Sequence, residues 1–353
     1  RSGANAKVTF SNGSVWTISQ CTIGGDSSIF GMEWIEGASG SDVRVLFAGP
    51  TDWSVSGMLI SDFSSVLLFL WGGASSGSNT SVVFAGETSW SLSESEVTGD
   101  SSMFKLEWVG STSGLDVDIR FLYSSWSLFN TVMQKRSPLL LLFWLGSDSG
   151  SNVTVAFSGK TSWMMVESSL SDNSVLCELE WKASRSGADV RVEFSEDTIW
   201  SIIYTSLASF SQLLGLVWLA ETMSTSISPS RTVLDVALPI ALILNTAFIE
   251  DRSSLLVIYQ PCSTVVSFTG PQLLRVQSSD LPAVYSLFVQ PGSDVQQNLV
   301  WDSGEVYVSG STIGAVLSTT AQTSNTYLDF TLTGLTADNT TFGALYQFSA
   351  LLP

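Results

Sequence analysis

Apolar and polar residues alternate along short runs throughout the first part of the chain. In one such run, Phe104, Leu106 and Trp108 alternate with Lys105 and Glu107. A period of two places successive side chains on opposite faces of an extended strand. Clusters of Gly, Ser and Asp separate the runs, and these residues favour turns. No part of residues 1–220 shows a helical period of about 3.6 residues with caps, so the pattern predicts an all-β fold with almost no helix.

Tryptophan marks a repeat within this region. Twelve of the thirteen Trp residues lie 18 or 19 residues apart. They are Trp16, Trp34, Trp53, Trp71, Trp90, Trp108, Trp126, Trp144, Trp163, Trp181, Trp200 and Trp218. A second marker, Ser-Gly-x-Asp/Asn, recurs every 36 or 37 residues, for example at 39–42 and 76–79. The repeat unit is therefore about 37 residues long, and six units occupy residues 1–220.

The last strand of each unit is of two kinds. In residues 104–108 one face is apolar, whereas residues 66–71 and 139–144 are apolar on both faces. A one-sided strand lies at a solvent-exposed surface, and a two-sided strand must be covered twice. The true repeat is then a pair of units, about 73 residues long and present three times. The nearly constant intervals also predict that each unit stacks in register on its neighbours.

The Trp spacing suggests how the strands pair. Trp53 begins one strand and Trp71 ends the next, and a turn near Ser61 and Asp62 lies midway between them. In an antiparallel hairpin these two Trp residues would be cross-strand neighbours, and the other Trp pairs would follow the same rule. The sequence therefore predicts a tandem antiparallel β-repeat array in which the twelve Trp side chains form a structural aromatic spine.

The periodicity stops after Trp218. Residues 221–232 are rich in Ser, Thr and Pro and read as a linker. From residue 233 to residue 353, about seven or eight short apolar or alternating runs are separated by turns, which favours a β-sandwich of jelly-roll or immunoglobulin-like topology. The predicted domains are a β-repeat domain over 1–220 and a β-sandwich domain over 233–353.

The residue inventory narrows the chemistry. The chain has no His, which excludes Ser-His-Asp and Cys-His triads and His-ligated zinc. Cys21, Cys177 and Cys262 lie far apart without CxxC spacing, and a buried, unpaired thiol is expected for each. We find no phosphate-binding glycine loop, dinucleotide fingerprint or nucleophile elbow. We therefore expect no enzymatic activity, no catalytic residue, no metal site and no cofactor.

Charge and hydropathy bear on partners and location. The chain has 14 basic and 32 acidic residues, and a net charge of −18 would repel nucleic acid. Its longest apolar run, 233–244, is interrupted by Asp235 and Pro239 and is too short for a transmembrane helix. Polar positions are filled mainly by hydroxyl residues, which favours an extracellular, cell-surface or virion location. Sequons at Asn12, Asn79, Asn152 and Asn339 leave N-glycosylation open.

These observations predict a non-enzymatic structural or adhesive protein of a virion, fibre, surface appendage or other extracellular assembly. Copies of the chain itself are the expected partners, because two-sided strands need a cover, and a surface glycan or receptor is a second kind of partner. Two alternatives stay open. One is a multivalent, lectin-like carbohydrate-binding protein whose exposed Trp or Tyr rings stack on sugars, and the other is an outer-membrane β-barrel.

Overall fold

The computed structural model contains strands and no helix in the residues that it describes. These residues are 5–37, 39–182, 186–187, 189–194, 198–218, 232–237, 241–245, 248–249, 254–260, 264–269, 273–277, 279–289, 296–320 and 326–349. From Lys7 to Trp218 the strands recur in sets of four, and each set makes one coil of the chain. The first coil consists of β1 (Lys7–Phe10), β2 (Ser14–Ser19), β3 (Thr22–Ile23) and β4 (Ser28–Trp34).

The following coils repeat this order. Their first strands are β5 (Arg44–Phe47), β9 (Ser81–Phe84), β13 (Val117–Leu122), β17 (Val153–Ser158) and β21 (Val190–Phe194). Their second strands are β6 (Thr51–Ser56), β10 (Thr88–Ser93), β14 (Ser124–Phe129), β18 (Thr161–Val166) and β22 (Thr198–Ile203). Their short third strands are β7 (Leu59–Ile60), β11 (Glu96–Val97), β15 (Val132–Met133), β19 (Ser169–Leu170) and β23 (Ser206–Leu207). Their fourth strands are β8 (Ser65–Trp71), β12 (Ser102–Trp108), β16 (Pro138–Trp144), β20 (Val175–Trp181) and β24 (Gln212–Trp218).

Each strand pairs in parallel with the equivalent strands of the coils before and after it. Trp53 in β6, for example, lies between Trp16 in β2 and Trp90 in β10. The predicted antiparallel hairpins are therefore wrong for the described strands, and Trp53 is not the cross-strand neighbour of Trp71. Alternation with a period of two is common to both arrangements, because it reports which face a side chain occupies and not which strand lies alongside.

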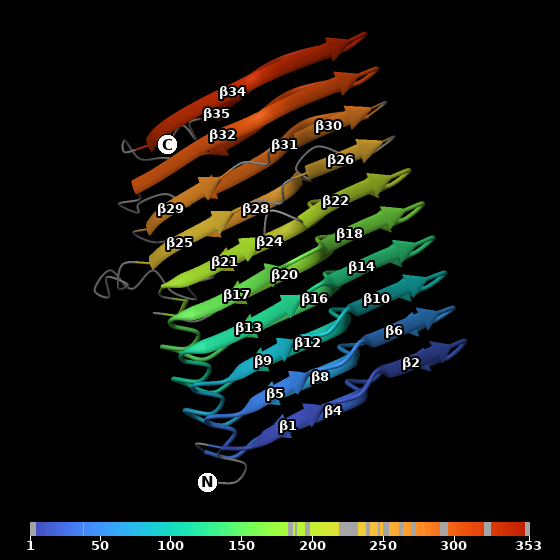
Figure 1. The fold of residues 1–353 in the computed structure, drawn as a ribbon, viewed down its shortest axis with the longest axis vertical. Coiled ribbons are helices and arrows are strands. Elements are labelled where there is room, and N and C mark those ends of the chain that lie inside the picture. Colours follow the sequence, from blue (N-terminus) through green and yellow to red (C-terminus); the bar gives the residue numbers. More distant parts are fainter. Residues whose placement is uncertain are drawn as a thin grey trace.

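The parallel ladders build two long sheets. Sheet A contains the first and second strands of each coil, and sheet B contains the third and fourth. The coils stack along one axis, with β1 at one end and β34 and β35 at the other (Figure 1). The fold is a β-solenoid whose two sheets enclose a single core between their inner faces.

The core takes every second residue from the strands of both sheets. In β6, Trp53 and Val55 are buried, whereas Asp52 and Ser54 point outward. Because equivalent residues of successive coils lie side by side, side chains of the same type stack on one another through the interior. Phe47, for instance, lies 4.4 Å from the Phe rings of both neighbouring coils, measured between centroids. Such stacked rings add packing energy beyond the burial of their area.

The Ser-Gly-x-Asp/Asn marker forms the turn that leads from sheet B back to sheet A. Its glycine has a positive φ and faces the Trp residues of sheet B, so that a Cβ on Gly77 would lie 2.4 Å from Trp108 Nε1. Its last residue also has a positive φ, and Asn79 donates from Nδ2 to Oδ1 of Asp42 at 2.6 Å. The same contact recurs two coils further on. Alternating Asp and Asn between coils replaces like-charge repulsion with charge-assisted hydrogen bonds.

The C-terminal strands continue both sheets. They are β25 (Thr232–Ala237), β26 (Ala241–Asn245), β27 (Phe248–Ile249), β28 (Ser254–Gln260), β29 (Thr264–Thr269), β30 (Leu273–Gln277), β31 (Asp280–Val289), β32 (Gln296–Ser309), β33 (Thr312–Thr320), β34 (Thr326–Asp338) and β35 (Thr341–Ser349). β25 and β26 pair in parallel with β21 and β22. The predicted jelly-roll-like sandwich over 233–353 is therefore not found among these strands. The predicted linker lies outside the described residues, apart from its last residue, Thr232.

Candidate interaction surfaces

The Trp residues of the predicted spine fall into two columns, one inside each sheet. The sheet A column contains Trp16, Trp53, Trp90, Trp126, Trp163 and Trp200. The sheet B column contains Trp34, Trp71, Trp108, Trp144 and Trp181. The backbone register places Trp218 next in that column, and its side chain is outside the described part of the structure.

Within these columns the indole rings stack closely. Neighbouring centroids are 4.7–5.3 Å apart and the rings are parallel within 8°, except for a tilted pair at Trp163 and Trp200. From the second to the fifth coil each of these side chains is at most 1% exposed. The buried rings are therefore not available to stack on a sugar.

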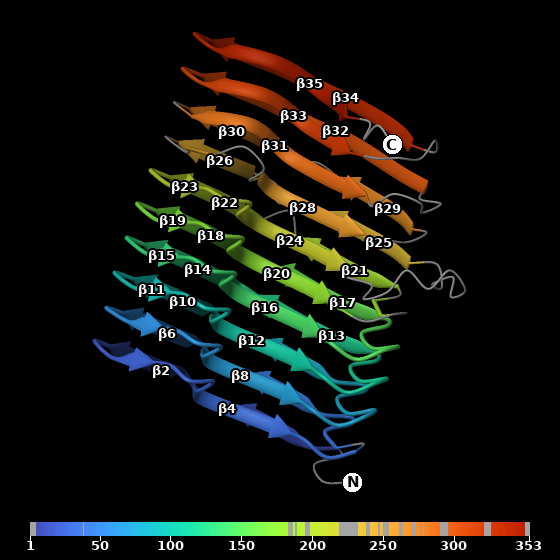
Figure 2. The ribbon, with the colours of Figure 1, turned by 180° about the vertical axis from the view of Figure 1, so that it is seen from behind.

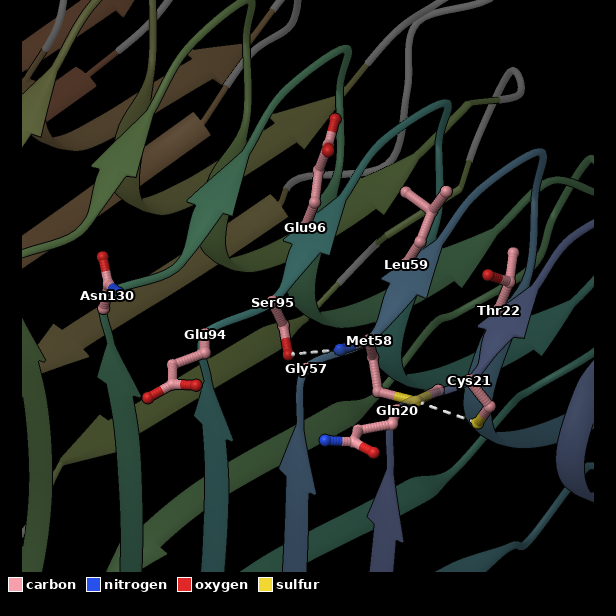
Figure 3. Close-up of a pocket in the computed structure, with 10 residues that line it drawn as sticks. All are labelled: Gln20, Cys21, Thr22, Gly57, Met58, Leu59, Glu94, Ser95, Glu96 and Asn130. Atoms are coloured by element: carbon pink, nitrogen blue, oxygen red, sulfur yellow. Dashed lines mark hydrogen bonds between the residues drawn. The ribbon is translucent and has the colours of Figure 1, made fainter.

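A pocket of about 620 Å³ lies at the corner where sheet A turns into sheet B in the first coils (Figure 3). The exposed thiol of Cys21 donates to Sδ of Met58 at 3.0 Å. In the next coils the same corner position is held by Met58 and then Ser95, whose Oγ accepts the backbone N–H of Met58 at 3.1 Å (Figure 3). A hydroxyl at this corner therefore binds the backbone of the preceding coil.

The two cysteines that the structure describes differ from each other. Cys177 is fully buried inside sheet B, and burial raises the pKa of its thiol. Cys21 is exposed, so the expectation of a buried thiol is wrong there. Cys262 lies outside the described residues.

A groove of about 710 Å³ crosses five coils of sheet A, at the bend between the first and second strand of each coil. We call it the axial groove; its lining includes Val15, Pro50, Asp52, Glu87, Ser89, Tyr123, Ser125, Lys160 and Ser162. Its length along the stack is roughly 19 Å, given the usual spacing between neighbouring strands. A single aromatic ring, two carboxylates, one ammonium group and a row of hydroxyls therefore line one straight channel.

Tyr123 is held in place by its neighbours in the axial groove. Its backbone N–H donates to Ser158 and its carbonyl accepts from Thr88, both at 3.0 Å. Its side chain is 54% exposed and lies over Gly159, where a Cβ would come within 2.8 Å of the ring. Across the groove, Ser89 Oγ donates to Asp52 Oδ1 at 2.5 Å. The backbone of Tyr123 and the carboxylate of Asp52 are thus both held by hydrogen bonds to neighbouring coils.

The outer face of sheet B differs from an ordinary solvated surface. Leu141 and Phe143 point outward from β16, and each is only 8% exposed. The adjacent strand β20 places Glu178 and Glu180 beside them, and Glu180 is only 3% exposed. The face is continuous from β4 through β8, β12, β16, β20 and β24 to β28 (Figure 2).

The carboxylates on this face are unequally neutralised. Glu180 Oε1 lies 3.4 Å from Lys182 Nζ and 3.7 Å from an Arg136 nitrogen. Among the described residues Glu178 has no ion pair. Burial, and then the charge of Glu180, raises the pKa of Glu178 to about 8. Burial also raises the pKa of Glu180, against the opposing effects of Lys182 and Arg136.

The described part of the chain contains no group of three or more His, Cys, Asp or Glu side chains that could hold a metal ion. Within those residues no helix has the length and apolar character that a membrane crossing requires. No protein-family model, curated protein or solved structure matches this chain.

Sequence reasoning did not find these surfaces. It placed Lys105 and Glu107 on an outward face, but it did not bring Glu178 or Tyr123 together with any neighbour. The signal was present, because residues about 37 positions apart lie side by side in a parallel stack. Aligning the units as columns would have placed Glu178 next to Leu141 and Ser125 next to Ser89.

Proposed function

We propose that this chain is a non-enzymatic structural or adhesive component of an extracellular or particle-surface assembly such as a fibre, virion or appendage. The observation that carries the proposal is the interior, where ring columns run without interruption from coil to coil. A core of this kind contributes rigidity and length, since each coil stabilises the next. The absence of His from the chain agrees with a role that needs no acid–base chemistry.

Location and morphology test this proposal. Antibody labelling of intact cells or particles from the source should reach the protein without permeabilisation. Electron microscopy of the native material should then show it in an ordered filament, shell or surface layer. Turnover of a glycoside or ester that is lost on substitution of an Asp or Glu residue would contradict the proposal.

The axial groove supports a second candidate function, the binding of a neutral linear glycan. Sugar sites combine an aromatic ring that packs on a pyranose face with carboxylates that accept hydroxyl hydrogen bonds. Tyr123 supplies the ring, and Asp52 and Glu87 supply the carboxylates. The groove also contains one cation, Lys160. Two carboxylates and one ammonium group leave a net negative charge, and this charge disfavours acidic glycans. This proposal replaces the sugar-stacking role of Trp with one exposed tyrosine.

A matched pair of variants tests glycan binding. Tyr123 and Tyr204 are both exposed and both have a positive φ, and only Tyr123 lines the axial groove. Because Asn tolerates this backbone conformation, Tyr123→Asn and Tyr204→Asn should both fold. In affinity electrophoresis with soluble xylan and hydroxyethylcellulose, Tyr123→Asn should lose retardation while Tyr204→Asn keeps it. Equal behaviour of the two variants, or no retardation of the unmodified chain, would contradict the proposal.

A further inference from the structure

The axial groove repeats the same two chain positions in each coil that it crosses. One is the exposed residue just before the second strand, and we call this series the bend row. The bend row consists of Gly13, Pro50, Glu87, Tyr123 and Lys160. The other is the first outward residue of the second strand, and we call this series the strand row. The strand row consists of Val15, Asp52, Ser89, Ser125 and Ser162, which are partners in the parallel ladder.

The step from one coil to the next is nearly a pure translation along this groove. The Trp residues that directly follow the strand row stack with their ring centroids 4.8–5.3 Å apart, and their planes are parallel within 8° over the first five coils. Neighbouring strands of ordinary sheets are rotated by roughly 20–25°. Both rows of the axial groove therefore run straight along the stack and repeat at this interval.

The strand row places a polar oxygen in each of four consecutive coils. The hydrogen bond from Ser89 to Asp52 leaves the second carboxylate oxygen of Asp52 and the lone pairs of Ser89 Oγ available to a ligand. Within the described part of the chain, the hydroxyls of Ser125 and Ser162 form no hydrogen bond. Val15 has no polar side-chain atom, so the series of oxygens begins in the second coil and ends in the fifth.

A glucan or xylan chain with β-1,4 linkages matches this repeat. Its sugar units are joined through equatorial bonds, so the chain is extended, and each unit advances by about the distance between two coils. Each unit carries hydroxyls that can donate to, or accept from, one oxygen of the strand row. An α-1,4-linked chain curves into a helix and would leave a straight groove within a few units. The straightness and the interval of the groove therefore favour the β-1,4 linkage.

We propose that the axial groove binds a neutral β-1,4-linked glucan or xylan with one sugar unit against each of the second, third, fourth and fifth coils. The proposal rests on glycan binding as the candidate function of this groove, and it adds the linkage and the register of the bound chain. Tyr123 packs on the face of the unit beside Ser125. Glu87 accepts hydrogen bonds from the unit at the third coil, and Lys160 donates to the unit at the fifth.

Oligosaccharides of defined length test this register. In isothermal titration calorimetry, the affinity for cello-oligosaccharides should rise about fivefold for each unit added from the disaccharide to the tetrasaccharide, because each unit adds about one net hydrogen bond. The pentasaccharide and hexasaccharide should bind within about twofold of the tetrasaccharide, since they add no strand-row contact. Maltotetraose should bind at least about tenfold more weakly than cellotetraose.

A matched pair of variants locates the sugar unit at the fifth coil. Ser162→Ala removes the strand-row hydroxyl of that coil, so cellotetraose should bind only about as tightly as cellotriose. Cellotriose fills the second to fourth coils and should keep its affinity within about twofold. Ser127→Ala removes a partly exposed hydroxyl from the same face of sheet A outside the groove, and should change neither affinity. Thermal unfolding of both variants checks that the fold is retained.

The possible outcomes separate the register from glycan binding itself. A rise in affinity up to four units, lost at the last unit in Ser162→Ala, supports the proposal. Equal binding of cello- and malto-oligosaccharides, or no rise with length, would overturn the linkage and the register and leave glycan binding in place. Equal weakening of cellotriose and cellotetraose by Ser162→Ala would overturn the register of one unit per coil. If no oligosaccharide binds, the inference and the glycan-binding function are both wrong.

Discussion

The two sheets of the solenoid are alike on their inner faces and different on their outer faces. Inside, both carry a column of stacked indoles, represented by Trp90 in sheet A and Trp108 in sheet B. Outside, β10 of sheet A presents Ser89, Ser91 and Ser93, whereas β16 of sheet B presents Leu141 and Phe143. The inner side chains pack against equivalent residues of the neighbouring coils, which favours the same residue type in every coil. The outer side chains are not restricted by this interior packing, so their types differ between the two sheets.

This difference has a physical meaning for a parallel sheet. Such sheets are usually covered on both faces, and their strands then read as continuous apolar runs. β16 is such a strand, since all seven of its residues are buried. β10 is not, because its outward residues are hydroxyls with partial exposure. β10 therefore has the composition of a strand with one solvated face, and β16 has that of a strand shielded on both faces.

The largest expected effect comes from removing a buried Trp side chain, and it tests whether the inner faces of the two sheets contribute equally to stability. Trp90→Ala and Trp108→Ala each remove a fully buried indole from the middle of a stack, and each should lower the free energy of unfolding by about 3–5 kcal/mol. Trp16→Ala should cost less, because Trp16 is only partly buried and its single stacked Trp neighbour among the described residues is Trp53. Urea denaturation measures all three. A cost at Trp108 far below that at Trp90 would show that the two interiors are not equivalent.

The second largest expected effect comes from a glycine that contacts the Trp column of sheet B. Gly77→Ala would place a Cβ 2.4 Å from Trp108 Nε1 at a φ of +64°, and should cost about 2–4 kcal/mol from the clash and backbone strain together. Gly25 is the matched control, since it has a similar φ and nothing within 4 Å of the added Cβ. Gly25→Ala should cost only about 1 kcal/mol. Equal costs in denaturant unfolding would mean that the contact with the indole contributes nothing.

The sequence predicted the repeating elements well and their pairing badly. Strands, turns and the absence of helix from the described residues followed from alternation and from Gly and Ser at fixed intervals. The pairing did not, because Trp53 and Trp71 alternate in the same way whether the chain folds back or coils onward. The equal spacing of equivalent residues was the better guide, since parallel stacking brings residues one unit apart into contact.

The C-terminal coils were missed for a different reason. Beyond Trp200, the register continues the sheet A column with Leu242, Leu274, Val306 and Leu335. The column stays apolar, but the marker residue is gone and the intervals are no longer constant. A search for repeated Trp residues therefore stops at Trp218, although the parallel strand pairing continues beyond it. The candidate surfaces could not be predicted from the sequence either, because each surface combines residues of several coils whose pairing was not known.

The third prediction concerns the charge on the outer face of sheet B. The pKa of Glu178 is raised to about 8, above its ordinary value, so the folded chain keeps a proton that the unfolded chain releases. Stability from this group is complete at low pH and is lost as pH rises toward and through about 8. Unfolding of the dilute chain should therefore be easier at pH 9 than at pH 6, by at least about 1 kcal/mol.

Two variants isolate this effect. Glu178→Gln cannot release the proton and should flatten the pH dependence over that interval. Glu180→Gln removes a charge that raises the pKa of Glu178 and should shift the loss to lower pH. Thermal unfolding across pH measures both. A Glu178→Gln chain with an undiminished slope would place the titrating group elsewhere.

The smallest effect compares the outer faces directly. Ser91 points outward from β10 between the hydroxyls of Ser54 and Ser127, and it has partial access to solvent. Ser91→Val trades a solvated hydroxyl for a better strand former, and its effect should stay within about 0.5 kcal/mol. Leu70→Ser, at an outward position of sheet B, removes apolar area that its neighbours largely shield and should cost about 1–2 kcal/mol. Urea unfolding at low protein concentration keeps association out of both values. Equal costs at the two positions would mean that the outer faces differ in composition and not in their contribution to stability.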